Sequence, residues 1–222
     1  MVGMPRACWL LCIALTLFAE EIHPITGRHI AQVMGMGGAN WLVRPEREAE
    51  EEPDKALDAI GIARGATVAD IGAGAGYITW RLAERVGPAG KVYANDIQPE
   101  MLVLLRKNIE ARHLSNVEPV LGVEDDPKLP AGRTDLVLLV DVYHEFTEPE
   151  KMLRKIRESL NADGRLVLLE YRKEDPNVPI RPEHKMSVAE VRAEVEPEGF
   201  RFEKTLETLP RQHILIFRKS VQ

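Results

Sequence analysis

The chain has 222 residues, of which 45% are hydrophobic and 29% are charged, and its formal net charge is −6 at pH 7. This length and composition are typical of one globular domain with a sizeable core. The acidic balance excludes a cationic surface suited to a phosphate backbone, so we expect no nucleic-acid partner.

The first 19 residues differ from the rest of the chain. Arg6 is followed by a short apolar run and then by Ala19, a pattern typical of a secretory signal peptide. The run is shorter than the ~20 residues that span a bilayer, so we expect no stable membrane span once residues 1–19 are removed. Export to the periplasm or the medium is the expected location, with a membrane anchor or a cytoplasmic protein as alternatives. Cys8 and Cys12, the two cysteines, both lie in this segment, so no disulfide or thiol chemistry is expected in the mature chain.

Residues 20–60 come before any regular alternation and are expected to form a helical cap over a main domain at 61–222. An acidic helical pattern runs to Gly61. Pro53 is expected to open its second part, because proline is tolerated in the first turn of a helix.

Strands and helices alternate from residue 66 onward. Short apolar runs predict strands at 67–71, 91–96, 116–122, 134–141, 165–171, 200–208 and 213–219. Helical periodicity predicts helices between them, most clearly at 98–113, with the helix after the third strand left open. The last two strands are joined by so few residues that they must be antiparallel. The pattern predicts an α/β fold with a doubly wound seven-stranded sheet, mostly parallel and closed by an antiparallel C-terminal hairpin.

Two capping boxes mark helix starts in the second half of the chain. Thr147 and Glu150 form one, and Ser187 and Glu190 form the other. In each pair the hydroxyl is expected to accept a hydrogen bond from the third helical amide while the glutamate accepts one from the amide of the capping residue.

Three glycines, Gly72, Gly74 and Gly76, connect the first strand to the following helix. Glycine lets a ligand approach the backbone, and the helix start offers unpaired amides. Asp96 ends the second strand, where an acid can accept hydrogen bonds from ribose hydroxyls. A plain tight turn and a helix-capping Asp96 are the structural alternatives, but the combination favours a nucleoside ligand.

The glycine spacing is G-x-G-x-G, which differs from the G-x-G-x-x-G of dinucleotide sites. Asp70 precedes it by two residues and would repel a pyrophosphate, whereas it suits a ligand that carries an ammonium group. S-adenosylmethionine combines an adenosine, a sulfonium and an amine. It is therefore the cofactor that the sequence favours.

"VADIGAGAGY" resembles motif I of the class I S-adenosylmethionine-dependent methyltransferases, and "VYANDIQPEML" resembles their second strand and its acid. The stretches "GVEDDPKLPAGRTDLVLLVDVYHEF" and "LNADGRLVLLEY" resemble their fourth and fifth strands. The similarity covers about residues 55–218 and is strongest to the small-molecule, quinone-biosynthesis-like (type 11) branch. It implies a Rossmann-like methyltransferase domain at 61–222. The substrate-side signatures of the quinone enzymes are not found, so their substrate is not carried over.

The resemblance also implies cofactor-binding roles for individual residues. The methionine part would be held by one group of residues, namely Asp70, Gly72, Gly74 and Gly76. Asp96 would bind the ribose, and Ile97 would pack on the adenine. Asp125 or Asp126 would face the adenine amine, and Asp141 would lie beneath the methyl donor.

The segment "DVYHEF" follows the fourth strand and is expected to point into the reaction cleft, together with Asp141 at its start. His144 is the candidate general base, because its ordinary pKa is close to neutral pH, and Tyr143 or Glu145 could orient it or the acceptor. A purely structural His144 is the alternative. His184 could lie in a lid or in a surface loop.

Two further sets of residues are weaker candidates. Trp41, Arg44 and Arg47 could contact an acceptor. A metal site would need histidines and carboxylates that converge. One group could do so, namely His144, Glu145, Glu170 and His184, but nothing in their spacing requires it, so no metal site is predicted.

The sequence thus predicts an enzyme that transfers a methyl group from S-adenosylmethionine to a small-molecule acceptor by in-line displacement. One alternative is a nicotinamide-dependent oxidoreductase, which the glycine spacing and the terminal hairpin disfavour. Another is an exported nucleoside-binding module without turnover. The acceptor and the oligomeric state are not predicted.

Overall fold

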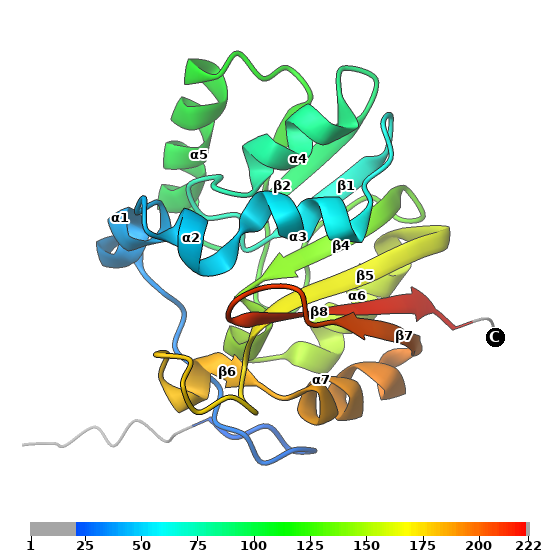
Figure 1. The fold of residues 1–222 in the computed structure, drawn as a ribbon. Coiled ribbons are helices and arrows are strands. Elements are labelled where there is room, and N and C mark those ends of the chain that lie inside the picture. Colours follow the sequence, from blue (N-terminus) through cyan, green and yellow to red (C-terminus); the bar gives the residue numbers. More distant parts are fainter. Residues whose placement is uncertain (1–20, 221–222) are drawn as a thin grey trace, which may run out of the picture.

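A single mixed sheet forms the centre of the molecule (Figure 1). The computed structural model describes residues 21–220, so the predicted signal peptide at 1–19 lies outside the described residues. The strands follow the order β3-β2-β1-β4-β5-β8-β7, and the short β6 pairs with β5. Their bounds are β1 Thr67–Ile71, β2 Lys91–Asp96, β3 Val117–Leu121, β4 Thr134–Val140, β5 Leu160–Arg172, β6 Lys185–Met186, β7 Phe200–Leu206 and β8 Gln212–Lys219.

Helices cover both faces of this sheet. The α-helices are α1 Ala39–Leu42, α2 Arg47–Glu51, α3 Pro53–Ile60, α4 Thr79–Val86, α5 Pro99–Ala111, α6 Pro149–Ser159 and α7 Val188–Val195. Short 3-10 turns lie at η1 Met36–Gly38, η2 Tyr143–Glu145, η3 Pro182–His184 and η4 Glu196–Glu198. Apolar side chains of α6 and α7 pack on one face, and those of α3 and α4 pack on the other.

The fourth strand lies in the middle of the core. Val137 and Leu139 face the layer of α6 and α7, whereas Leu136 and Leu138 face the layer of α3 and α4. All four side chains are buried. This explains why residues 136–140 are continuously apolar, since both faces of this part of the strand are covered.

The predicted fold class is confirmed. β1 pairs in parallel with β2 and β4, and β8 pairs antiparallel with β5 and β7. The sheet has one strand more than predicted, because residues 185–186 add the two-residue β6 to the edge of β5. Among the described residues no helix connects β3 to β4. A turn closed by a bridge between Val123 and Asp126 lies there instead.

The predicted helix starts are confirmed at two positions and wrong at a third. Pro53 opens α3, and Ser187 caps α7 with Glu190 in a complete capping box. The box at Thr147 does not form. The helix α6 begins at Pro149 with Glu148 as its N-cap, which places Glu150 one position too early to complete the box.

The N-terminal segment is attached to the sheet near the ends of the parallel strands. Arg28 is buried, and its Nε and Nη2 donate to the Glu194 carboxylate of α7 at 2.9 and 3.1 Å. Its Nη1 and the Ala31 amide both donate to the carbonyl oxygen of His144, at 3.0 and 3.1 Å. These contacts fix the start of the described chain against the segment that follows β4. The division into a cap at 20–60 and a domain at 61–222 stays a prediction.

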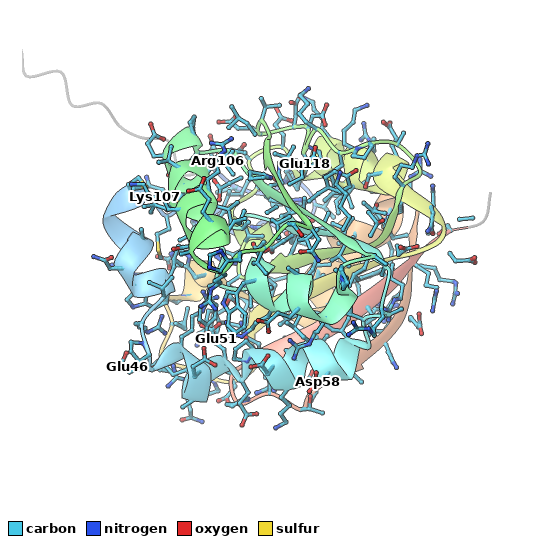
Figure 2. All side chains as sticks on the ribbon, turned by 90° about the horizontal axis from the view of Figure 1, so that it is seen from above. Glu46, Glu51, Asp58, Arg106, Lys107 and Glu118 are labelled. Atoms are coloured by element: carbon cyan, nitrogen blue, oxygen red, sulfur yellow. The ribbon has the colours of Figure 1, made fainter. Side chains whose placement is uncertain are left out.

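Charged side chains of both signs cover the outside of the molecule, and Figure 2 labels several of them, namely Glu46, Asp58, Arg106, Lys107 and Glu118. Glu51 is labelled in the same view but is buried, with 2% of its surface exposed. Within residues 21–220, no helix combines the length and the apolar character needed to cross a membrane.

Candidate active site

A cavity of about 580 Å³ opens where the parallel strands β1, β2 and β4 end. β2 lies on one side of β1 and β4 on the other, so the connections leave β1 and β4 in opposite directions and a crevice remains between them. The N-terminal segment around α1 and the turn η3 form the remaining walls. The volume is in the range of pockets that enclose a small organic ligand.

The glycine loop forms one wall of the cavity. Gly72, Gly74 and Gly76 have positive φ angles of 70°, 55° and 90°, a conformation that favours glycine. A Cβ at Gly72 would lie 2.4 Å from Val142 Cγ2, and one at Gly76 would lie 2.6 Å from Leu105 Cδ1. Gly72 and Gly74 line the cavity, but Gly76 does not. Gly76 therefore permits close packing on α5 and is not placed to touch a ligand.

Asp96 ends β2 and lines the cavity beside Ile97. Its Oδ2 accepts from the Gly74 amide at 2.8 Å, and its Oδ1 accepts from the Gln98 amide at 2.9 Å. Burial raises the pKa of Asp96 despite these hydrogen bonds. The second of them closes a turn just before α5, whose N-cap is Gln98 and which has no side-chain cap, so the capping role offered as an alternative for Asp96 is not seen. Each carboxylate oxygen keeps a further lone pair for a ligand hydroxyl.

Asp70 lies at the end of β1 with 2% of its surface exposed. Its Oδ2 accepts from Thr79 Oγ1 at 2.6 Å. Burial raises the pKa of Asp70 from 3.8 to about 7, and the nearby Asp96 adds to this increase. A cation bound in the cavity would favour the ionised form of this carboxyl group.

We expect Asp70→Asn to stabilise the protein at pH 8, because the wild-type carboxyl group is buried and ionised there. The unfolded carboxyl group loses its proton near pH 3.8, and the folded one near pH 7. Between these values the folded state binds more protons, so the free energy of unfolding of the wild type falls as the pH rises. Urea unfolding of both proteins from pH 4 to pH 8 measures this. A difference between them that does not grow with pH would contradict the assignment.

Asp141 follows β4 and has a positive φ of 52°, which is uncommon for a residue other than glycine. Its Oδ2 accepts from Gln212 Nε2 at 2.7 Å and lies 3.8 Å from Arg47 Nη2. Its Oδ1 is buried and has no hydrogen-bond partner among the described residues. Burial, together with Glu51 and Glu170, raises the pKa of Asp141 well above its ordinary value. An unpartnered carboxylate oxygen in a cavity wall suits a cationic group of a ligand.

Arg47 and Tyr171 support this part of the wall. Arg47 Nε donates to Glu51 Oε2 at 2.7 Å, and Tyr171 Oη donates to Glu51 Oε1 at 2.9 Å. Arg47, a weaker candidate for an acceptor contact, lines the cavity beside Asp141. Sequence reasoning missed Glu51, which stands in an acidic run that resembles a solvated helix. It also missed Tyr171 and Gln212, because only the antiparallel pairing of β5 with β8 brings them to this end of the sheet.

His144 lies in η2 with 2% of its surface exposed and lines the cavity. Its Nδ1 is 2.6 Å from Glu170 Oε2, and its Nε2 is 3.1 Å from His184 Nδ1. Burial lowers the pKa of His144, but the Glu170 carboxylate outweighs burial and the net shift is upward. Burial, together with His144, lowers the pKa of His184. The structure therefore brings together two histidines that lie 40 positions apart in the sequence.

Besides Gly76, three predicted site residues do not line the cavity. Tyr143 is fully buried in the core, packs edge-to-face on Phe146 at 5.5 Å between ring centroids, and does not line the cavity. Asp125 is exposed. Asp126 accepts from the amide and the Nζ of Lys128, at 2.7 and 2.8 Å. The prediction that Tyr143 takes part in catalysis, and that Asp125 or Asp126 faces an adenine, therefore does not agree with their positions.

Glu124 is the acidic residue of that turn that lines the cavity. It directly precedes Asp125 and Asp126 in the sequence, and part of its side chain is exposed to solvent. The sequence "EDD" offers three adjacent acids with no periodic pattern, so only the fold of the turn distinguishes them.

Comparisons with known proteins agree with this geometry. A family described as "Methyltransferase domain" matches residues 62–207, which is more than half of the chain. The ubiquinone/menaquinone biosynthesis C-methyltransferase UbiE of Escherichia fergusonii is 33% identical over 118 residues, which cover 53% of this chain and 47% of the relative. The chain thus spans about half the length of the curated relatives that it matches.

Solved structures show the same architecture over most of the chain. An S-adenosylmethionine-dependent methyltransferase from Aquifex aeolicus superimposes with a TM-score of 0.79 at 29% identity, covering 83% of this chain and 98% of the other. A putative type 11 methyltransferase from Sulfolobus solfataricus has a TM-score of 0.65 at 20% identity, covering 78% and 95%. At 20% identity, the similarity to the Sulfolobus solfataricus protein shows a shared fold and nothing about function. The family match and the glycine-loop cavity together establish that the chain belongs to the class I S-adenosylmethionine-dependent methyltransferases.

Proposed function

We propose that the protein transfers a methyl group from S-adenosylmethionine to a small-molecule acceptor by in-line displacement. The observation that carries this proposal is the carboxyl group of Asp141, which follows β4 and lines the cavity, and whose buried Oδ1 has no hydrogen-bond partner among the described residues. A carboxylate oxygen in that position complements the positive charge of the cofactor. When bound, S-adenosylmethionine supplies a methyl group activated by a sulfonium.

The side chains of the cavity fit the parts of this cofactor. Gly72 and Gly74 would accommodate its methionine part against the backbone, with Asp70 and Asp141 supplying negative charge. Asp96 would accept hydrogen bonds from the ribose. Two further residues would contact the adenine, namely Ile97 through its apolar surface and Glu124 in place of the predicted aspartates.

A pyrophosphate fits the same cavity poorly. Asp70 and Asp141 line the cavity next to the glycine loop, and in their ionised forms they would repel the negative charge of a nicotinamide dinucleotide. This supports the methyltransferase over the oxidoreductase alternative. Only a measurement of methyl transfer distinguishes a methyltransferase from a nucleoside-binding module without turnover.

The acceptor end of the cavity combines apolar and basic side chains. Phe146, Met152 and Ile180 line it together with His144 and His184. We infer an acceptor with a compact apolar or aromatic body and one ionisable group that faces the histidines. The quinone-biosynthesis activity named for UbiE belongs to a relative that matches over half its length, and it is one candidate within this class.

Asp96→Ala tests the placement of the ribose. Loss of the hydrogen bonds to its hydroxyls should weaken S-adenosylmethionine binding by ~1–3 kcal/mol, which is about 5- to 150-fold in Kd. Isothermal titration measures the change. Asp125→Ala is the matched control, because Asp125 is also acidic but does not line the cavity. This variant should bind the cofactor like the wild type. Equal affinity of the two variants would show that the ribose is placed wrongly.

The transfer itself is tested with methyl-labelled cofactor. The purified protein is incubated with small-molecule extracts, and mass spectrometry detects labelled products. We expect at least one labelled compound that is absent with a His144→Asn variant. If the protein binds the cofactor but labels no compound in the extracts, the binding-module alternative is favoured.

We also propose that residues 1–19 direct export. Arg6, the apolar run and Ala19 support this proposal. N-terminal sequencing of the protein purified from a bacterial periplasm or culture medium should begin after Ala19. A full-length chain that remains with the cytosol would contradict it.

A further inference from the structure

We propose that His144, Glu145 and His184 bind a divalent transition-metal ion at the acceptor end of the cavity. One ligand atom from each of these side chains lies within 4.8 Å of the others, and all three line the cavity. They come from two separate turns, η2 after β4 and η3 before β6. The proposal deepens the proposed function, on which its catalytic meaning rests.

Glu170 fixes the ring of His144. Its carboxylate is fully buried in β5, where Oε1 accepts from the Tyr143 amide at 3.0 Å and Oε2 lies 2.6 Å from His144 Nδ1. A carboxylate can only accept, so His144 Nδ1 carries a proton and donates it. The lone pair of the neutral ring is then on Nε2, which faces His184 Nδ1 at 3.1 Å. A buried carboxylate behind a histidine is the arrangement that orients histidine ligands of metal ions.

His184 presents its own ring nitrogen to the same point. Its Nδ1 is 3.1 Å from His144 Nε2, and the two rings meet edge-to-face with centroids 5.1 Å apart. Nitrogen ligands of a tetrahedral zinc ion, with bonds of about 2.0–2.1 Å, are separated by about 3.3 Å. A shift of a few tenths of an ångström in the turn Pro182–His184 would let both lone pairs point at one ion.

Glu145 is the third ligand and supplies negative charge. Its side chain is half-buried, and no lysine or arginine forms an ion pair with it within residues 21–220. Glu170, which pairs with the adjacent His144, places a second acidic group at this end of the cavity. A cation in contact with Glu145 would balance a carboxylate that no basic side chain of the described residues pairs with.

The ligand set indicates which ions fit. Two imidazoles and one carboxylate suit Zn²⁺ or Fe²⁺, whereas Mg²⁺ and Ca²⁺ prefer oxygen ligands. Three protein ligands would leave at least one position of the ion open, and all three side chains line the cavity. Open positions are typical of catalytic metal sites.

The open position would bind an anionic oxygen or sulfur of the acceptor, so the proposal narrows the acceptor to a compound with an ionisable hydroxyl or thiol. The acceptor loses its proton to solvent as it binds. Its oxygen or sulfur then forms a bond to the methyl carbon, the bond from that carbon to the cofactor sulfur breaks, and the electron pair stays on that sulfur, which leaves S-adenosylhomocysteine. His144 would act here as a ligand in place of the general base that the sequence predicts.

Metal binding can be measured without cofactor or acceptor. Untagged full-length protein is stripped with a chelator, dialysed against Zn²⁺, and assayed for metal by mass spectrometry, and Co²⁺ is added separately to record visible absorption. We expect about one Zn²⁺ per chain and Co²⁺ bands of a four- or five-coordinate site. His184→Ala and Glu145→Gln should each lose at least about tenfold in Zn²⁺ affinity, and Glu170→Gln about 10- to 100-fold through the orientation of His144.

His113→Asn is the control, because His113 is exposed and does not line the cavity. It should bind Zn²⁺ like the wild type. A wild type that retains no more Zn²⁺ than His184→Ala, or a Co²⁺ spectrum unchanged by the protein, would overturn the metal site. Neither result would affect binding of the cofactor. Titration with S-adenosylmethionine therefore distinguishes a failure of the metal site from a failure of the methyltransferase proposal.

Discussion

His144→Asn is expected to lower the rate of methyl transfer by ~100-fold or more, while affinity for S-adenosylmethionine stays close to that of the wild type. His144 lies at the acceptor end of the cavity, and its Nε2 is the atom that would accept a proton or bind a metal ion. Either role is typically worth ~10²–10⁴ in rate. Asparagine keeps a donor for Glu170, so the buried carboxylate is not left unpaired.

His213→Asn is the matched control for this prediction. His213 is also buried, with its Nδ1 2.6 Å from Glu207 Oε1, but it does not line the cavity. Steady-state kinetics with a fixed acceptor measures both variants. Rates that fall equally in the two would indicate a loss of stability, and a wild-type rate in His144→Asn would remove this residue from the reaction.

Gly74→Ala is expected to weaken cofactor binding by about tenfold or more. Its Cβ would meet no atom closer than Leu42 Cδ1 at 3.5 Å, so the folded protein can accommodate it. Leu42 and Gly74 both line the cavity, however, so the new methyl group would lie where a ligand approaches the loop. Overpacking of this kind costs ~1–3 kcal/mol.

Gly132→Ala separates this effect from backbone strain. Gly132 has a φ of 66°, close to the 55° of Gly74, and a Cβ there would meet nothing within 4 Å. Both variants should lose ~1–2 kcal/mol of stability, because an alanine is strained in the left-handed conformation. Only Gly74→Ala should lose cofactor affinity in isothermal titration. An equal loss of affinity in both variants would mean that the glycine loop does not touch the cofactor.

Most of the fold could be predicted because its signals are local. Residues 136–140 of β4 form a continuous apolar run, and both faces of this part of the strand are buried. Ser187 and Glu190 are placed correctly because the helix starts at the residue after Ser187. Thr147 fails because Pro149 takes the first helical position and moves the N-cap by one residue. A capping box can be placed from the sequence only if the first residue of the helix is known, and here the sequence did not reveal that residue.

Site residues that belong to a local sequence motif could be predicted. Site residues that only the tertiary fold brings together could not. The glycine loop and Asp96 follow single strands, so spacing alone places them. His144 and Tyr143 are neighbours in a tight turn that sends one side chain to the cavity and the other to the core, and no pattern in "DVYHEF" distinguishes them. His184 reaches His144 only because β6 pairs with the end of β5.

We expect the cavity to hold a cationic adenosyl cofactor and not a dinucleotide. Isothermal titration of the purified protein with S-adenosylmethionine, S-adenosylhomocysteine and NAD tests it directly. Heat from the first two ligands, at one site per chain, and none from NAD is the predicted result. Heat from NAD alone would show that the cavity binds a dinucleotide and not S-adenosylmethionine.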